Sequence, residues 1–240
     1  MRGVVLVHSS DLHVDDDGVP KHDPAGGYDG LSGLASVLAT AQAIKADLVL
    51  LVGDTFDNHR VSASVLMQAS NLLAVSPVSV VILPGNHDPV MPPCLYHRSG
   101  IVDLPHVHVL GIANCSSLQW PDLDLEIWGH AHRDYGDMAP LRSPPPRTTR
   151  WQVALAHGHY LPPEDAHLAG QRAWQITDQD LADTGADYIA LGHWDRPVSV
   201  GDGSVPAHYS GSPDLAKTAN LVLLDPRSGV TIRREPLRQP

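Results

Sequence analysis

The chain has 240 residues, of which 42% are hydrophobic and 18% charged, and a formal net charge of −11 at pH 7. With no apolar run of about 18 residues, no signal-peptide pattern and two cysteines, we expect one soluble, cytoplasmic domain over residues 1–240, with no membrane span or disulfide framework. The acidic excess disfavours binding of long DNA, which usually needs a basic surface. A phosphate-bearing substrate remains compatible with it if bound divalent cations invert the local electrostatic field.

The N-terminal part alternates strand and helix patterns. The β-branched run at residues 4–7 predicts a first strand, and the five apolar residues 48–52 predict a strand buried on both faces, as in a parallel sheet covered by helices. Apolar residues at helical spacing predict helices at 31–44 and 65–73, and residues 78–83 predict a third strand. The resulting order is β-α-β-α-β, which is typical of a parallel sheet.

The pattern weakens after residue 91 and then returns. Residues 141–150, with three prolines and three arginines, predict an extended surface loop. A helix is expected around Leu181. Further strands are predicted at residues 107–110, 123–128, 152–156 and 188–191, with short antiparallel strands at 205–209, 221–224 and 230–233 closing the fold.

Polar side chains with metal-binding or acid–base chemistry follow the predicted strands. Asp11 and His13 come after the first strand, and a two-residue spacing in an extended loop points both side chains the same way. Asp54 follows the second strand at the edge where ligands bind in open α/β sheets, so its two carboxylate oxygens could bridge two metal ions. The third strand ends at Asn86, His87 and Asp88, and the later strands at 152–156 and 188–191 end at His157, His193 and Asp195.

Seven of these side chains form a mixed nitrogen and oxygen ligand set: Asp11, His13, Asp54, Asn86, His157, His193 and Asp195. Such a set suits Mn, Fe or Zn, and with one bridge it provides about four ligands for each of two ions. Two ions about 3.5–4 Å apart would clamp a phosphoryl group and produce a bridging hydroxide that attacks phosphorus in line with the leaving oxygen. His87 is left for proton donation or charge stabilisation, with Asp88 able to orient its ring.

Five segments in chain order resemble the motifs of the calcineurin-like metallophosphoesterases. They are Asp11-Leu12-His13, Gly53-Asp54-Thr55-Phe56-Asp57, Gly85-Asn86-His87-Asp88, the strand-end His157, and Gly192-His193. The resemblance runs from the first strand to about Ser212 and implies a central β-sandwich flanked by helices, in an α/β (α+β) four-layer fold. It also implies a dinuclear site at one edge, with Mn as the expected ion and Fe or Zn as alternatives. One metal would be held by Asp11, His13 and Asp54, and the other by Asp54, Asn86, His157 and His193.

The sequences of residues 191–197 and 209–213 look most like those of the DNA-repair exonuclease branch of that superfamily. Three features depart from it. Asp195 stands where the last motif normally has a second histidine, and we predict that its carboxylate ligates the first metal and favours a harder ion. Asp57 stands where the repair nucleases tend to have a histidine. Only about 28 residues follow Ser212, so we do not expect their additional DNA-reading domain.

Other histidines compete for the same roles. The Gly129-His130-Ala131-His132 segment matches the last motif better than the segment that begins at Gly192-His193 does. However, the family pattern would then need a strand-end histidine before residue 129, where no candidate is left, and His193 would be unexplained. His159 is an alternative to His157, which ends its strand directly.

Three further residues are candidate substrate contacts: Trp194, Tyr160 and Arg196. Arg196 would contact phosphate, while plain packing explains the two aromatic residues equally well.

The sequence therefore predicts a metal-dependent phosphoesterase that acts on a small phosphodiester or a phosphomonoester. Nucleotides and nucleic acids are candidate substrates. One alternative is a DNA exonuclease subunit whose grip on DNA comes from a partner chain. The other is a non-catalytic scaffold that binds a protein. No membrane partner is expected, and nothing in the sequence indicates a protein partner.

Overall fold

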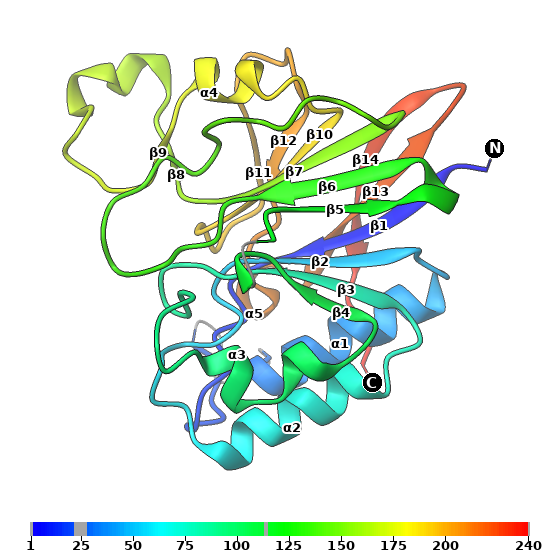
Figure 1. Ribbon diagram of the computed structural model, residues 1–240, viewed down its shortest axis with the longest axis vertical. Coiled ribbons are helices and arrows are strands. Elements are labelled where there is room, and N and C mark those ends of the chain that lie inside the picture. Colours follow the sequence, from blue (N-terminus) through cyan, green and yellow to red (C-terminus); the bar gives the residue numbers. More distant parts are fainter. Residues whose placement is uncertain (1, 22–27, 113–114, 240) are drawn as a thin grey trace.

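The computed structural model describes residues 2–21, 28–112 and 115–239, which form two six-stranded sheets packed face to face (Figure 1). The first sheet has the order β14-β13-β1-β2-β3-β4, with β1 (Val4–Ser9), β2 (Leu48–Val52), β3 (Ser79–Leu83), β4 (Val107–Val109), β13 (Thr218–Asp225) and β14 (Gly229–Pro236). The second has the order β11-β12-β10-β7-β6-β5, with β5 (Ser117–Trp120), β6 (Leu125–Gly129), β7 (Trp151–His157), β10 (Tyr188–Gly192), β11 (Val198–Val200) and β12 (Ala207–Tyr209).

Helices cover the outer faces of both sheets. They are α1 (Gly30–Ala43), α2 (Ala63–Ala74), α3 (Leu95–Arg98), α4 (Asp178–Asp183) and α5 (Pro213–Ala216), and a small sheet pairs β8 (His159–Tyr160) with β9 (Gln175–Ile176). Figure 1 shows α1 and α2 on the outer side of the first sheet and α4 on the outer side of the second. This helix–sheet–sheet–helix order confirms the predicted four-layer α/β fold with a central β-sandwich.

The alternation of side chains along β2 explains the layers. Leu48 and Leu50 belong to the core between the two sheets, whereas Val49 and Leu51 pack against α1 and α2. All five residues of this strand are buried, as predicted. However, the second sheet covers one of its faces, so the expectation of helices on both faces was wrong. A continuous apolar run predicts that both faces of a strand are buried, but it does not indicate whether a helix or a second sheet covers each face.

The parallel strands bring their C-terminal ends to one edge of the sandwich. In the first sheet β1, β2 and β3 run parallel, and in the second β6, β7 and β10 run parallel. The loops after these strands gather at the left of Figure 1. The residues that follow the strands can therefore converge from both sheets.

Most predicted elements are present within a few residues of their expected bounds, but the direction of one strand was wrong and several short elements were not predicted. The strand at 205–209 corresponds to β12, which runs parallel to β10 and pairs antiparallel only with β11. The chain turns back twice after β10, and this restores the parallel direction. The edge strand β5 was not predicted because its short sequence, Ser-Leu-Gln-Trp, carries little apolar signal.

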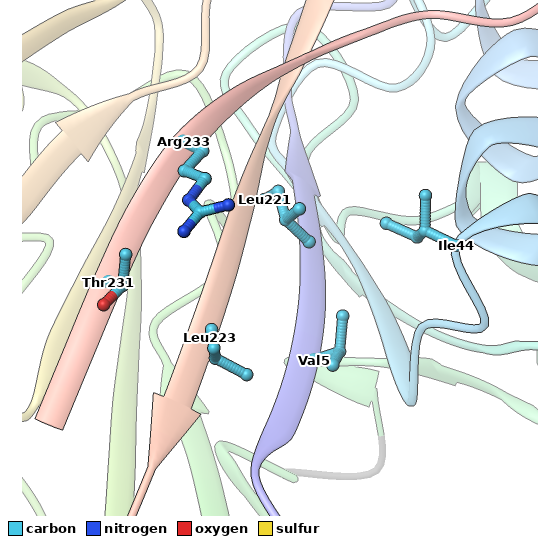
Figure 2. Close-up of a pocket in the computed structure, with 6 residues that line it drawn as sticks. All are labelled: Val5, Ile44, Leu221, Leu223, Thr231 and Arg233. Carbon is cyan, nitrogen blue, oxygen red and sulfur yellow. The ribbon is translucent and has the colours of Figure 1, made fainter. Parts of the chain in front are cut away.

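The outer face of the first sheet also carries a shallow groove near the start of β1. Figure 2 shows the residues that line it: Val5, Ile44, Leu221, Leu223, Thr231 and Arg233. Ile44 reaches it from the end of α1, and the other five project from β1, β13 and β14. In the part of the chain that the structure describes, no helix combines the length and apolar character needed to cross a membrane.

A buried histidine between the sheets makes the fold sensitive to acid. His8 is 0% exposed, its Nδ1 lies 2.9 Å from the Tyr188 hydroxyl, and burial lowers its pKa to about 3. The unfolded chain takes up this proton near pH 6.5, so the stability from neutral His8 is present above that pH and is lost as the pH falls.

We expect wild type to lose about 2 kcal/mol more of its unfolding free energy than His8→Gln between pH 6.5 and pH 5. Urea unfolding of both proteins in EDTA at the two pH values measures this difference. Equal losses in the two proteins would contradict the assignment.

Candidate metal centre

The backbone at the strand ends adopts a conformation that side chains other than glycine rarely take. Asp11, His13, Asp54 and His193 have φ values of 55°, 48°, 51° and 107°. Such residues cluster at functional sites, because only a surrounding framework holds them there. Part of that framework joins the loops after β1 and β2, where the Asp11 and His13 amides donate to the carbonyl oxygens of Gly53 and Asp54 at 3.1 and 3.0 Å.

Two glycines of the motifs are required by close packing. A Cβ atom on Gly53, which has a φ of 85°, would lie 1.8 Å from Nδ1 of His157. A Cβ atom on Gly85 would lie 2.2 Å from Oδ1 of Asp54. Any larger residue would therefore displace the side chains that the two loops bring together.

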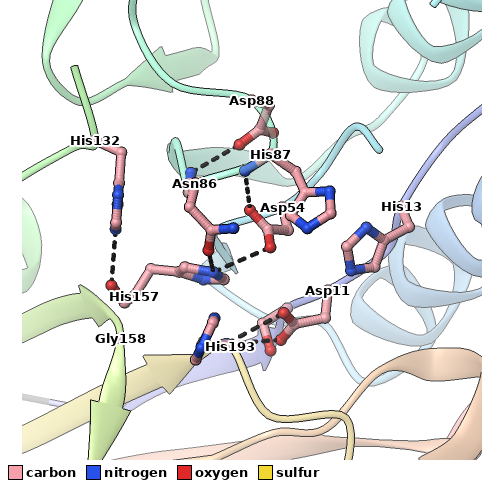
Figure 3. Close-up of polar contacts among 12 residues, drawn as sticks. Asp11, His13, Asp54, Asn86, His87, Asp88, His132, His157, Gly158 and His193 are labelled. Carbon is pink, nitrogen blue, oxygen red and sulfur yellow. Dashed lines mark hydrogen bonds and ion pairs between the residues drawn. The ribbon is translucent and has the colours of Figure 1, made fainter. Parts of the chain in front are cut away.

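The first cluster of possible ligands surrounds Asp54. Figure 3 shows its carboxylate between His87, Asn86 and His157. Nε2 of His157 lies 3.1 Å from Oδ2 of Asp54 and 3.1 Å from Oδ1 of Asn86. One ligand atom each of Asp54, His157 and His193 lies within 4.8 Å of the others. The ligand set predicted for one metal is brought together here from the ends of β2, β3, β7 and β10: Asp54, Asn86, His157 and His193.

His157 has the tautomer that a metal ligand needs. Its Nδ1 lies 3.0 Å from the carbonyl oxygen of Val52, which can only accept, so Nδ1 carries a hydrogen. In the neutral ring the lone pair is then on Nε2, which faces Asp54 and Asn86. A backbone carbonyl that orients the second ring nitrogen is typical of histidines that bind metals.

A second cluster shares Asp54 with the first. One ligand atom each of Asp11, His13 and Asp54 lies within 4.8 Å of the others. The Asp11 carboxylate also accepts the backbone N–H of His193 at 3.0 and 3.1 Å, which links the two sheets. Because Asp54 belongs to both clusters and has two carboxylate oxygens, its side chain is placed to contact two cations.

The charges of the described site favour a cation. Burial lowers the pKa of His157, but the neighbouring Asp54 carboxylate outweighs this and raises it to about 9. Despite burial, the contact with Asp57 and the charges of Asp54 and Asp11 likewise raise the pKa of His13 to about 9. Burial raises the pKa of Asp11 to about 6. Burial acts in the same direction on Asp54, but the charge of His157 and its contact with the carboxylate outweigh it and hold the pKa of Asp54 below its usual range. Cations that replaced these protons would keep the charge balance, and the oxygen and imidazole donors suit Mn, Fe or Zn.

His87 lies beside these clusters with its ring exposed to solvent. Its ring centre is 4.8 Å from that of His13, and its Nδ1 lies 2.7 Å from the carbonyl oxygen of Asp57. The carboxylate of Asp57 in turn lies 3.2 Å from Nδ1 of His13. Asp57 therefore touches both rings, a contact that the sequence analysis missed.

Asp88 does not orient His87, so this expectation was wrong. Its buried carboxylate accepts the Gly85 and Phe56 N–H groups at 2.7 and 3.0 Å and the Tyr96 hydroxyl at 2.6 Å. These three donors turn the side chain toward the core and brace the loops after β2 and β3. Asp88 thus shapes the site without touching its reactive face.

The remaining candidates lie around the clusters. Asp195, with Trp194 and Arg196, lines a pocket that also contains His193. Among the described residues, the groups of three possible ligands do not include Asp195. Tyr160 packs in the outer core of the second sheet with its hydroxyl on Asp178, which agrees with the packing alternative for this residue.

The competing histidines stay outside the described clusters. Nε2 of His132 donates to the His157 carbonyl oxygen at 2.9 Å, behind the ligand rather than beside it. His130 contacts the Arg142 carbonyl oxygen. His159 is engaged by the Trp194 indole N–H at 3.1 Å.

Comparison with known proteins gives one family. A family model described as calcineurin-like phosphoesterase matches residues 4–197. A search of curated protein sequences gave no match.

Three solved structures share the fold at low sequence identity. A Thermus thermophilus protein has 12% identity and a TM-score of 0.61, covering 98% of this chain and 99% of its own. A Staphylococcus aureus protein, provisionally named a 5′-nucleotidase and bound to alpha-ketoglutarate, has the same identity and TM-score over 99% of this chain, which spans 54% of that one. An archaeal phosphodiesterase has 16% identity and a TM-score of 0.50, covering 98% and 100% of the two chains. At these identities the likeness supports the fold alone.

Proposed function

This chain belongs to the calcineurin-like phosphoesterase family, and we propose that it hydrolyses a small phosphodiester with two divalent metal ions. The observation that carries the proposal is the position of Asp54, which is shared by two clusters of ligand atoms, each within 4.8 Å. A phosphomonoester is the alternative substrate.

The residues divide into two ligand groups. We infer that Asp11, His13 and Asp54 hold one ion, and that Asp54, Asn86, His157 and His193 hold the other. Mn is the expected ion, with Fe or Zn as alternatives. When bound, the ions would supply Lewis acidity at the phosphoryl oxygens and an activated water. The protein keeps the ligands in place through the Val52 carbonyl oxygen behind His157.

His87 has the position of a proton donor. Its Nδ1 hydrogen is directed to the Asp57 carbonyl oxygen, which leaves Nε2 to carry the proton that moves. The exposed ring lies next to the His13 side of the clusters, where it can reach a leaving oxygen. We infer that protonated His87 gives up its Nε2 proton as the phosphorus–oxygen bond breaks.

Two other functions are less well supported. A DNA exonuclease subunit would have to take its phosphate contacts from a partner chain, because this chain has a net charge of −11. A protein-binding scaffold has no need of a complete ligand set, yet both described clusters are present.

Hydrolysis assays with the purified, Mn-loaded protein test the proposal. We expect release of alcohol from methyl esters of nucleoside monophosphates and from simple aryl diesters, and loss of activity in EDTA that Mn restores. Fewer than one bound ion per chain after Mn loading, or no hydrolysis of any ester, would contradict it. Salt-sensitive DNA binding by the isolated chain would favour the nuclease.

Ligation of the first ion by Asp195 stays a prediction. We expect Asp195→His to keep hydrolysis and to change the ratio of activity with Zn to activity with Mn on the order of tenfold, because imidazole suits Zn better than a carboxylate does. Activity at matched metal occupancy measures this ratio. An unchanged ratio would show that residue 195 does not contact the metal.

A further inference from the structure

A pocket opens directly beside His193, which is one of the residues that line it. It is lined by Trp194, Asp195 and Arg196 from the loop after β10 and by Leu215 from α5. Its volume of about 560 Å³ is within the range of small-molecule sites, about 300–1,000 Å³. Because His193 belongs to one ligand cluster, a molecule in this pocket would lie next to a phosphoryl group at the metal centre.

The indole of Trp194 is held rigidly at this pocket. It stacks on Tyr209 with ring centres 4.4 Å apart and planes 10° apart, and its Nε1 donates to Nδ1 of His159 at 3.1 Å. Tyr209 is itself fixed, since its hydroxyl donates to the Gly158 carbonyl oxygen at 2.7 Å and accepts the Tyr160 N–H at 2.8 Å. A ring fixed before binding loses little conformational entropy when a ligand stacks on it.

The wall combines apolar surface with charge. Trp194 and Leu215 are half-buried and offer apolar contact, and Arg196 is exposed at the same pocket. A planar heterocycle fits this combination, because its face stacks on an aromatic ring and its polar edge accepts hydrogen bonds from a guanidinium. An aliphatic alcohol would use neither feature.

We propose that this pocket binds an aromatic ring in the alcohol part of the substrate, stacked on Trp194, so that the preferred substrates are nucleotide-like phosphodiesters. This inference rests on the proposed function and names the substrate class of the same site. It also agrees with the acidic surface, since a single nucleotide ester needs far fewer phosphate contacts than a long nucleic acid does.

A matched pair of substrates tests the pocket separately from the chemistry. The methyl ester of a nucleoside 5′-monophosphate and that of ribose 5-phosphate have the same phosphodiester and differ at C1 of the sugar, where a hydroxyl replaces the base. Methyl phenyl phosphate distinguishes a simple aryl ring from a nucleobase. We expect wild type to have a KM for the nucleoside ester roughly tenfold or more below that for the ribose ester, with similar kcat.

Variants at the pocket should remove this preference. In Trp194→Leu we expect the KM values of the two esters to converge, whereas Trp194→Phe should retain most of the difference. Leu215→Ala keeps the stacked rings intact and should weaken the preference severalfold, so the test does not depend on one variant. Trp120→Leu on the edge strand β5 is the control, and it should behave as wild type does.

Equilibrium binding of a nucleoside monophosphate gives a readout that does not depend on turnover. Calorimetry on the Mn-loaded protein should show nucleoside monophosphate binding roughly tenfold more tightly than ribose 5-phosphate, and Trp194→Leu should abolish the difference. Hydrolysis of both esters with equal KM, or an unchanged preference in folded Trp194→Leu, would overturn the inference while leaving the proposed function intact. Absence of hydrolysis of all three esters, methyl phenyl phosphate included, would contradict the proposed function itself.

Discussion

Replacing Asp54 with alanine is expected to remove both metal ions and all detectable hydrolysis. Its carboxylate belongs to both ligand clusters, and Nε2 of His157 lies 3.1 Å from its Oδ2. The remaining ligands would provide at most three side chains for either ion, without the charge that holds them. Elemental analysis after Mn loading should fall from about two ions per chain to fewer than one.

Two further variants separate this effect from loss of fold. Asp54→Asn keeps the side-chain shape and an oxygen that can accept the His87 backbone N–H, now 2.9 Å from Oδ1. It should lose metal in the same direction while remaining folded by circular dichroism. Asp183→Ala removes an exposed carboxylate from α4 and should retain both ions. Hydrolysis by Asp54→Ala at more than a few per cent of the wild-type rate would exclude Asp54 as the bridge.

Replacing His87 with alanine should instead leave the metal content unchanged and slow turnover by roughly 10²–10⁴-fold, the usual range for a proton-transfer group. The exposed ring contacts His13 and the Asp57 carbonyl oxygen, and its loss leaves the two ligand clusters that share Asp54 in place. Because the side chain lies at the surface, stability should change by about 0.5 kcal/mol or less. Steady-state kinetics together with elemental analysis measure both parts.

His97→Ala is a matched control, because it removes another exposed histidine, from α3. It should have wild-type kinetics. If His87→Ala loses an ion, residue 87 is a ligand and the proton-donor role is wrong. If it retains both ions and full turnover, another group supplies the proton.

The order of the elements was predictable because the apolar patterns are strong where the structure is regular. Residues 48–52 coincide with β2, and the predicted helix at 31–44 overlaps α1. The edge strands were harder, since they are short and have one side open to water. The parallel direction of β12 depends on two reversals of the chain that no local pattern records.

The candidate site was predictable to the extent that it depends on strand ends. The structure brings Asp11, His13, Asp54, Asn86, His157 and His193 together because their strands run parallel in two packed sheets. Side-chain direction within a loop is not fixed by sequence order. Asp88 is adjacent to His87 in the chain, yet it points toward Tyr96 and the core. The contacts of Asp57 likewise depend on how the loops after β1, β2 and β3 meet.

Anomalous X-ray diffraction from crystals of the Mn-loaded protein tests the central claim most directly. We predict two peaks about 3.5–4 Å apart, with the carboxylate of Asp54 coordinating both and His157 and His193 on one side. A single peak, or two peaks of which Asp54 contacts at most one, would contradict the account.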